Sequence, residues 1–187
     1  MATFLVLILV VVVQLCGDLL AKQPAIQVVN FEKGSTCVMS ESKEARLKVL
    51  TDLLKIHTPN GNEIEVAQYI GKLFDQAGIS YHIDSFGDRR ANLVAEIGDK
   101  QTDDVLVLTG HQDTVTIPRP EQWQHDPFGA EIVGDRLYGR GAADMKSGLA
   151  AQILTLIELV KEASQFPARC ASLQLPARSL GHQALTG

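Results

Sequence analysis

The feature that most constrains the fold of this chain is a regular alternation of helical and strand-like patterns between residues 39 and 162. Amphipathic or apolar helical patterns cover residues 40–57, 66–78 and 149–160. Strand-like patterns between them read YHIDSF (81–86), ANLVAEI (91–97) and VLVLT (105–109), with a hairpin pattern at 130–139. Ser40 is the expected N-cap of the first helix, and Gly78 closes the second. Helices that alternate with strands in this way predict an α/β sheet domain.

Two candidate site residues follow directly after the strand-like segment 105–109. This segment is apolar throughout, which predicts a strand covered on both faces, and it leads into Gly110-His111-Gln112-Asp113. Ligands of α/β sheets collect at the carboxyl ends of strands. A neutral imidazole such as that of His111 binds zinc-like ions, and the Asp113 carboxylate can hold the other ring nitrogen. The competing interpretation is that His111 only caps a turn.

A second candidate site precedes the last helical pattern, in the glycine-rich segment GRGAADMKSG (139–148). Its glycines allow a tight backbone path, and Asp144 projects from a loop, where one carboxylate can bridge two cations. Gly139-x-Gly141 also resembles the start of a dinucleotide-binding fingerprint. However, Asp144 stands where that fingerprint needs its third glycine, and its charge would face a pyrophosphate. The remaining alternative is an ordinary turn before a helix.

Taken together, GHQDTV (110–115) and WQHDPFGAEIVGDRLYGRGAADMKSGLAA (123–151) closely resemble the acetylornithine deacetylase and succinyl-diaminopimelate desuccinylase family. This family belongs to a superfamily of two-metal amide hydrolases that includes aminoacylases, carboxypeptidases and di- and tripeptidases. The resemblance covers residues 40–162. It implies a zinc-peptidase-like catalytic domain of the α/β class, in which a mostly parallel mixed sheet lies between helices.

The resemblance also assigns roles to matching residues. It implies that His111 ligates one metal ion, that Asp113 orients the His111 ring, and that Asp144 bridges two divalent ions, zinc or cobalt. In relatives the peptide after this aspartate is often cis, which here is the Asp144–Met145 bond. The metal ions polarise the scissile carbonyl and lower the pKa of a bridging water. The other histidines match no role and are expected at the surface or in packing: His57, His82, His125 and His182.

The activity implied by the resemblance is hydrolysis of an N-acyl amide bond on a small amino-acid substrate. Succinyl-diaminopimelate is the first expectation and acetylornithine the second. The alternatives are a di- or tripeptidase or a carboxypeptidase of the same superfamily, and a non-catalytic remnant that binds metal weakly or not at all. A homodimer is compatible with the full-length relatives.

The sequence departs from the family pattern after residue 162. The family carries a Glu-Glu pair there, one glutamate as general base and the other as a metal ligand, whereas residues 176–180 read PARSL. We likewise expect the lid domain and the further ligands of the family to be absent. A one-base shift in a suitable choice of codons turns CASLQLPARS (170–179) into LRFTATAGEE, so we hypothesise a frameshift in an atypical tail, residues 163–187. Residues 39–162 are then the N-terminal part of a catalytic domain, and we expect the chain as written to be incomplete and inactive.

The first 38 residues differ from the rest in composition. Residues 4–13 read FLVLILVVVV, a run too short for a membrane span of about 20 residues, and no Lys or Arg precedes it as in a signal peptide. We expect residues 1–38 to be an extension outside the folded domain, such as a misassigned start. A signal, an anchor at residues 4–13 and a buried strand are the alternatives.

Charge and cysteine content limit the classes of partner and the cellular compartment that we expect for this chain. The chain has 17 Lys+Arg against 22 Asp+Glu, a net charge of −5, and no basic patch, which argues against nucleic acid as a partner. Its three cysteines cannot all pair within the chain and lack metal-ligand spacing, which is typical of a reducing compartment. We therefore expect a cytoplasmic protein with a small-molecule substrate and, unless residues 4–13 are an anchor, no membrane contact.

Overall fold

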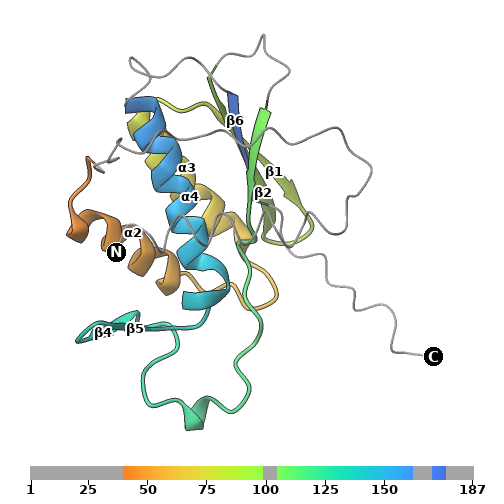
Figure 1. The fold of residues 1–187 in the computed structure, drawn as a ribbon. Helices are drawn as coiled ribbons and strands as arrows, with labels where there is room; N and C mark the ends of the chain where they lie inside the picture. Colours follow the sequence, from red (N-terminus) through yellow and green to blue (C-terminus); the bar gives the residue numbers. More distant parts are fainter. Residues whose placement is uncertain (1–39, 99–104, 162–169, 176–187) are drawn as a thin grey trace, which may run out of the picture. The chain divides into compact units, whose positions relative to one another are not determined.

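The computed structural model describes residues 40–98, 105–161 and 170–175. All of them belong to the second of the two units into which the chain divides, residues 39–187. The predictions for residues 1–38 lie outside the described residues, as do those for residues 163–169 and 176–187 of the tail. The described part confirms the α/β class, because helices and strands pack into one core (Figure 1).

The first described helix, α2 (Lys43–Lys55), is capped by a different serine from the one expected. The Ser42 hydroxyl oxygen accepts a hydrogen bond from the Ala45 N–H at 3.1 Å, so the prediction of Ser40 as the N-cap is wrong. Ser40 instead donates its backbone N–H and its hydroxyl to the buried Glu158 carboxylate, at 2.8 and 2.7 Å. A partner 118 residues away therefore takes the serine that the local pattern assigns to the cap.

Helices α3 (Glu63–Ala77) and α4 (Ser147–Lys161) run side by side on one side of the sheet (Figure 1). α3 ends where Gly78 adopts a left-handed backbone conformation with φ 70°, as the sequence predicts. Fully buried side chains of the core come from all three helices and from the sheet: Leu53, Val66, Ile70, Phe74, Leu93, Leu149, Ile153 and Leu156. This shared core fixes the ends of the loops that leave it.

Among the described residues the main sheet contains four strands in the order β1-β2-β6-β3. Their bounds are Tyr81–Phe86 for β1, Arg90–Ile97 for β2, Val105–Thr109 for β3 and Cys170–Leu175 for β6. β2 pairs antiparallel with β1 and with β6, whereas β6 pairs parallel with β3. The sheet is mixed, as predicted; among the described strands two pairs are antiparallel and one is parallel, and α2, α3 and α4 lie on one side of them (Figure 1).

Strand β3 differs from the fully covered strand that its apolar sequence predicts. Leu106 and Val107 are 58% and 49% exposed. Within the described residues β3 pairs with β6 alone, so it forms an edge of this part of the sheet. The prediction of a strand covered on both faces is therefore wrong here, because an apolar sequence does not specify which elements are present to cover it.

Strand β6 occurs where the sequence predicts no regular element. It is formed by residues 170–175 of the atypical tail and lies between β2 and β3. In the parallel pair, Cys170 is opposite Val105 and Gln174 is opposite Thr109. The sequence CASLQL lacks the continuous apolar run that identified residues 105–109 as a strand, and backbone hydrogen bonds to two neighbouring strands are what define β6.

Two smaller elements connect the sheet to the candidate site. The 3₁₀ turn η1 (Pro120–Gln122) follows β3, and the predicted hairpin is present as β4 (Glu131–Val133) and β5 (Arg136–Tyr138). Gly134 in its turn has φ 62°. None of the described helices combines the length and the apolar character that a membrane crossing requires.

Candidate metal centre

His111 lies at the carboxyl end of β3, two residues after the strand ends at Thr109. Its Nδ1 is 2.9 Å from the backbone oxygen of Asp113 and 3.3 Å from the Asp113 Oδ1. Both oxygens are acceptors, so Nδ1 carries the donated proton. The buried Asp113 thus holds the ring from one side and leaves Nε2 facing away from it, which is the contact that its expected orienting role requires.

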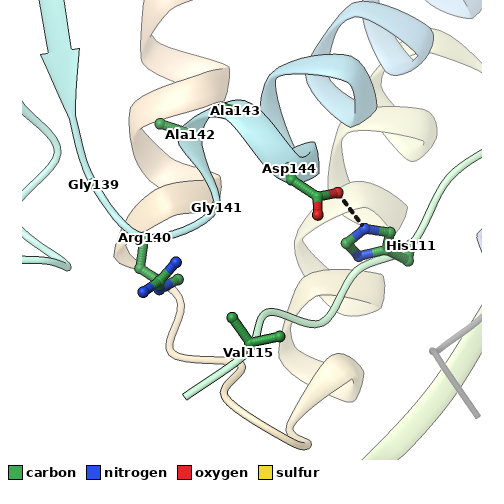
Figure 2. A pocket seen from close by; sticks show the side chains of 8 residues that line it. All are labelled: His111, Val115, Gly139, Arg140, Gly141, Ala142, Ala143 and Asp144. Carbon is green, nitrogen blue, oxygen red and sulfur yellow. Dashed lines mark hydrogen bonds and ion pairs between the residues drawn. The ribbon is translucent and has the colours of Figure 1, made fainter. Parts of the chain in front are cut away.

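Asp144 reaches the same place from the wide helical turn η2 (Ala142–Lys146), which leads into α4. Its backbone is not helical, with φ −126° and ψ 100°, and the Asp144–Met145 peptide is cis, as the resemblance implies. The Asp144 side chain is 70% exposed, and its Oδ1 lies 2.8 Å from His111 Nε2 (Figure 2). The structure therefore brings the candidate residues together, with Asp113 and Asp144 on opposite ring nitrogens of His111.

The His111–Asp144 pair borders a cavity of about 180 Å³. Figure 2 shows the Asp144 carboxylate directed at the His111 ring, with Arg140 and Val115 across the cavity from the pair. The guanidinium of Arg140 lies 5.1 Å from the centre of the Trp123 ring. No sequence pattern predicted a role for Arg140, although its place between two glycines of the candidate segment is a signal that could have identified it as a lining residue.

Backbone hydrogen bonds fix the loop that carries His111 to the segment after α2. The Thr114 N–H donates to the Thr58 oxygen at 3.0 Å, and the Asn60 N–H donates to the Thr114 oxygen at 3.2 Å. The Thr58 hydroxyl donates to the Gln112 oxygen at 3.1 Å. Thr58, Gln112 and Thr114 are buried, so water does not compete for these bonds and the loop has little freedom to move.

Lys146, two residues after Asp144, is only 1% exposed. Its Nζ donates to the backbone oxygens of Leu53 and Ile56, at 2.8 and 2.7 Å, near the carboxyl end of α2. Burial disfavours the charged form and lowers the pKa of Lys146 to about 8. No sequence pattern predicted a role for this lysine, because a lysine near a candidate ligand can equally well be an exposed charge.

The donor atoms suit a zinc-like divalent cation but are too few to complete a site. The contact between His111 Nε2 and Asp144 Oδ1 has the length of a hydrogen bond; with the ring proton on Nδ1 alone, Nε2 and the Asp144 carboxylate would both offer lone pairs to a cation. A catalytic zinc normally takes three protein ligands. Within residues 40–98, 105–161 and 170–175, no cluster of three or more His, Cys, Asp or Glu side chains is placed to hold a metal ion. His111 and Asp144 therefore supply two of the ligands that a centre needs.

The other histidines within the described ranges make packing or surface contacts, as predicted. His57 stacks on Phe128 with ring centres 3.7 Å apart, and His125 approaches Tyr138 at 3.9 Å. The exposed His82 pairs with Asp84 at 2.7 Å. None of these histidines lines the cavity beside Asp144, and His182 lies outside the described residues.

Comparison with known proteins places these residues in a family context. Residues 107–173 match the peptidase family M20/M25/M40. A probable succinyl-diaminopimelate desuccinylase of Staphylococcus aureus is 41% identical over 126 residues, which are 67% of this chain and 31% of that protein. The succinyl-diaminopimelate desuccinylase of Wolbachia pipientis is 38% identical over 106 residues, or 57% of this chain and 26% of that protein. The chain thus spans less than a third of the length of these relatives.

Solved structures share the fold of the described part. An M20 family metallo-carboxypeptidase of Sulfolobus solfataricus has a TM-score of 0.61 and 23% identity, over 71% of this chain and 30% of that one. Human carnosine dipeptidase 1 has a TM-score of 0.62 and 18% identity, over 72% of this chain and 32% of that one. The family match includes both His111 and Asp144. The chain is accordingly similar to the N-terminal portion of proteins of peptidase family M20/M25/M40.

Proposed function

We propose that this chain carries part of the metal centre of an enzyme that hydrolyses an N-acyl amide bond on an amino acid. The observation that carries the proposal is the 2.8 Å contact between His111 Nε2 and Asp144, with Asp113 on the opposite ring nitrogen. All three residues lie inside the stretch that matches the peptidase family. The 41% identity to a protein named as a probable desuccinylase supports an acyl amide as the bond that is cleaved.

His111 and Asp144 would supply two of the ligands for a pair of divalent cations, zinc or cobalt, and the family resemblance gives Asp144 the bridging role. When bound, such ions polarise the scissile carbonyl and lower the pKa of a water molecule. The buried Asp113 keeps the His111 proton on Nδ1, so the Nε2 lone pair remains available as a ligand. The exposed Asp144 has two carboxylate oxygens, of which one faces His111 and the other can face a second ion.

The remaining parts of the reaction are not supplied by the residues that the structure describes. The family pattern requires a general base and further acidic ligands, and no third ligand-type side chain joins His111 and Asp144 within the described ranges. A general base typically contributes about 10²–10⁴-fold in rate. A competent centre therefore needs groups from outside these ranges.

We propose a small N-acyl amino acid as the substrate, with succinyl-diaminopimelate first and acetylornithine second. The support for this order is the identity of 41% and 38% to proteins named after the first substrate. The likeness to carboxypeptidase and dipeptidase structures, at 23% and 18% identity, concerns the fold. A peptidase of the same superfamily and a non-catalytic remnant are the outcomes that the experiments must separate.

Zinc titration of the full chain tests the metal centre. Calorimetry should detect zinc binding to the wild-type chain and its loss in His111→Ala and in Asp144→Ala. His82→Ala is the matched control, because His82 also contacts an aspartate but lies exposed and outside the cavity. Zinc binding that survives both substitutions refutes the assignment of His111 and Asp144, and a wild-type chain that binds no zinc is the non-catalytic remnant.

A chimera tests the reaction itself. Residues 40–161 would replace the matching segment of the Staphylococcus aureus relative, and the product would be assayed with succinyl-diaminopimelate, acetylornithine and a dipeptide. Hydrolysis of an acyl amino acid that disappears with His111→Ala supports the proposal. Hydrolysis of the dipeptide alone would identify a peptidase. A folded chimera that is inactive on all three, while the parent is active, would identify a remnant.

A further inference from the structure

Lys146 is the buried charged residue next to the centre to which the proposed reaction assigns no task. It lies at the end of η2 and is 1% exposed. Its side chain runs away from the cavity and donates to the oxygens of Leu53 and Ile56, at 2.8 and 2.7 Å. Its backbone N–H donates to the Gly141 oxygen at 2.9 Å, which closes the turn that contains Asp144. Both ends of Lys146 are therefore fixed.

The backbone of η2 joins Asp144 to Lys146. The Asp144 side chain is 70% exposed and its Oδ1 contacts His111 Nε2 at 2.8 Å, whereas its backbone is neither helical nor part of a strand. Lys146 is two residues away and is the member of this turn that is buried. A displacement of Lys146 would consequently be transmitted to Asp144 through the two peptide bonds between them.

The segment that Lys146 binds is continuous with the one that holds the His111 loop. Leu53 and Ile56 lie at the end of α2, and Thr58 and Asn60 follow within the next four residues. Thr58 and Asn60 exchange backbone hydrogen bonds with Thr114 at 3.0 and 3.2 Å. Residues 53–60 thus contact both halves of the centre, although 33 residues separate His111 from Asp144.

We propose that Lys146 is a positioning residue, which ties the Asp144 turn to residues 53–60 and thereby sets Asp144 against His111. The inference concerns the geometry of the His111–Asp144 pair and holds whether or not the pair binds metal. Zinc binding rests on the proposed function, so zinc affinity is measured separately from the contact between His111 and Asp144.

Nitrogen-15 NMR of the His111 ring in the full chain, without metal, reports the contact directly. His111→Ala assigns the signals, and Asp144→Ala shows their positions when the contact is lost. Lys146→Met keeps the length and burial of the side chain but donates no hydrogen bond. We expect it to move the His111 Nε2 signal most of the way to its position in Asp144→Ala. Zinc affinity should fall about 10- to 100-fold, as for other residues that orient metal ligands.

Two further variants separate positioning from general stability. Val49→Ala removes buried volume from the same helix, α2, without touching either half of the centre, and it should leave the His111 signals unchanged. Lys146→Gln keeps an N–H donor on a shorter side chain and should give an intermediate signal. An unchanged His111 signal in Lys146→Met overturns the inference, as does an equal change in Val49→Ala. If both Lys146 variants fail to fold while Val49→Ala folds, Lys146 is a folding residue and the positioning role is rejected.

The geometric and functional proposals fail in different ways in this experiment. If Lys146→Met moves the His111 signal but the wild-type chain binds no zinc, the positioning role stands and the proposed function fails. If zinc binds equally to the wild-type chain and to Lys146→Met, and the His111 signal is unmoved, the function stands and the positioning role fails.

Discussion

Substitution of Gly141 by alanine should destabilise the protein through two effects that can be separated. Gly141 has φ 86°, a conformation that costs a residue with a side chain about 1–2 kcal/mol. A Cβ added there would also lie 2.7 Å from the Thr114 Cγ2. Thr114 is buried and held by two backbone hydrogen bonds, so it cannot withdraw easily, and overpacking of this kind costs about 1–3 kcal/mol. We expect Gly141→Ala to lower the free energy of unfolding by about 2–5 kcal/mol.

Equilibrium unfolding in urea measures this loss against a matched control. Gly134→Ala places a side chain at a position with a similar backbone conformation, φ 62°, in the turn between β4 and β5. The added Cβ meets nothing within 4 Å there. It should cost the backbone term alone, about 1–2 kcal/mol. Thr114→Ser removes the clashing methyl group, so the double variant with Gly141→Ala should recover the steric term. The reasoning is refuted if Gly141→Ala costs no more than Gly134→Ala, or if the double variant recovers nothing.

Acidification, truncation and turnover provide three further checks. Burial raises the pKa of Glu158, but hydrogen bonds from Ser40 outweigh burial and lower that pKa from 4.5. The stability that the ionised Glu158 contributes should therefore be present above pH 4.5 and be lost as the pH falls below that value. Glu158→Gln should flatten this acid limb of the urea midpoint against pH, and an unchanged limb would contradict the assignment. Protein expressed from Met39 should be at least as soluble as the full chain in a sedimentation assay, because α2 has its own cap. Aggregation of the shorter form alone would show that residues 4–13 pack into the core. With added zinc or cobalt, the 187-residue chain should hydrolyse succinyl-diaminopimelate more than about tenfold more slowly than a full-length relative, since a general base alone contributes about 10²–10⁴-fold. Turnover within about tenfold of the relative would show that other residues do the chemistry.

Elements defined by contacts along their own length were predictable from the sequence. The apolar stripe of α3 and the glycine that ends it depend on spacing within one helix, and Gly78 caps α3 as predicted. The cap of α2 was not predictable, because Ser40 and Ser42 each have an acidic residue within the next two positions and look alike locally. The choice between them depends on Glu158, which lies 118 residues from Ser40 in the sequence.

The surroundings of a strand were less predictable than the strand itself. The apolar sequence at 105–109 identified β3 correctly, but it could not indicate that Leu106 and Val107 are exposed. Exposure depends on which elements cover the strand, and within the described residues β3 has β6 as its sole strand partner. β6 was missed for the complementary reason, since its place is defined by backbone pairing with β2 and β3.

The same division between side-chain chemistry and backbone contacts applies to the centre. His111, Asp113 and Asp144 could be found because metal binding demands particular side chains in a particular order, and the structure brings the three together. The task proposed for Lys146 left no comparable signal. Leu53 and Ile56 meet Lys146 through backbone oxygens, which every residue type possesses, so no sequence pattern marks the place where the lysine binds. Substitutions at Ile56 that preserve the backbone should accordingly leave the His111–Asp144 contact intact, whereas the removal of the single donor at Lys146 should not.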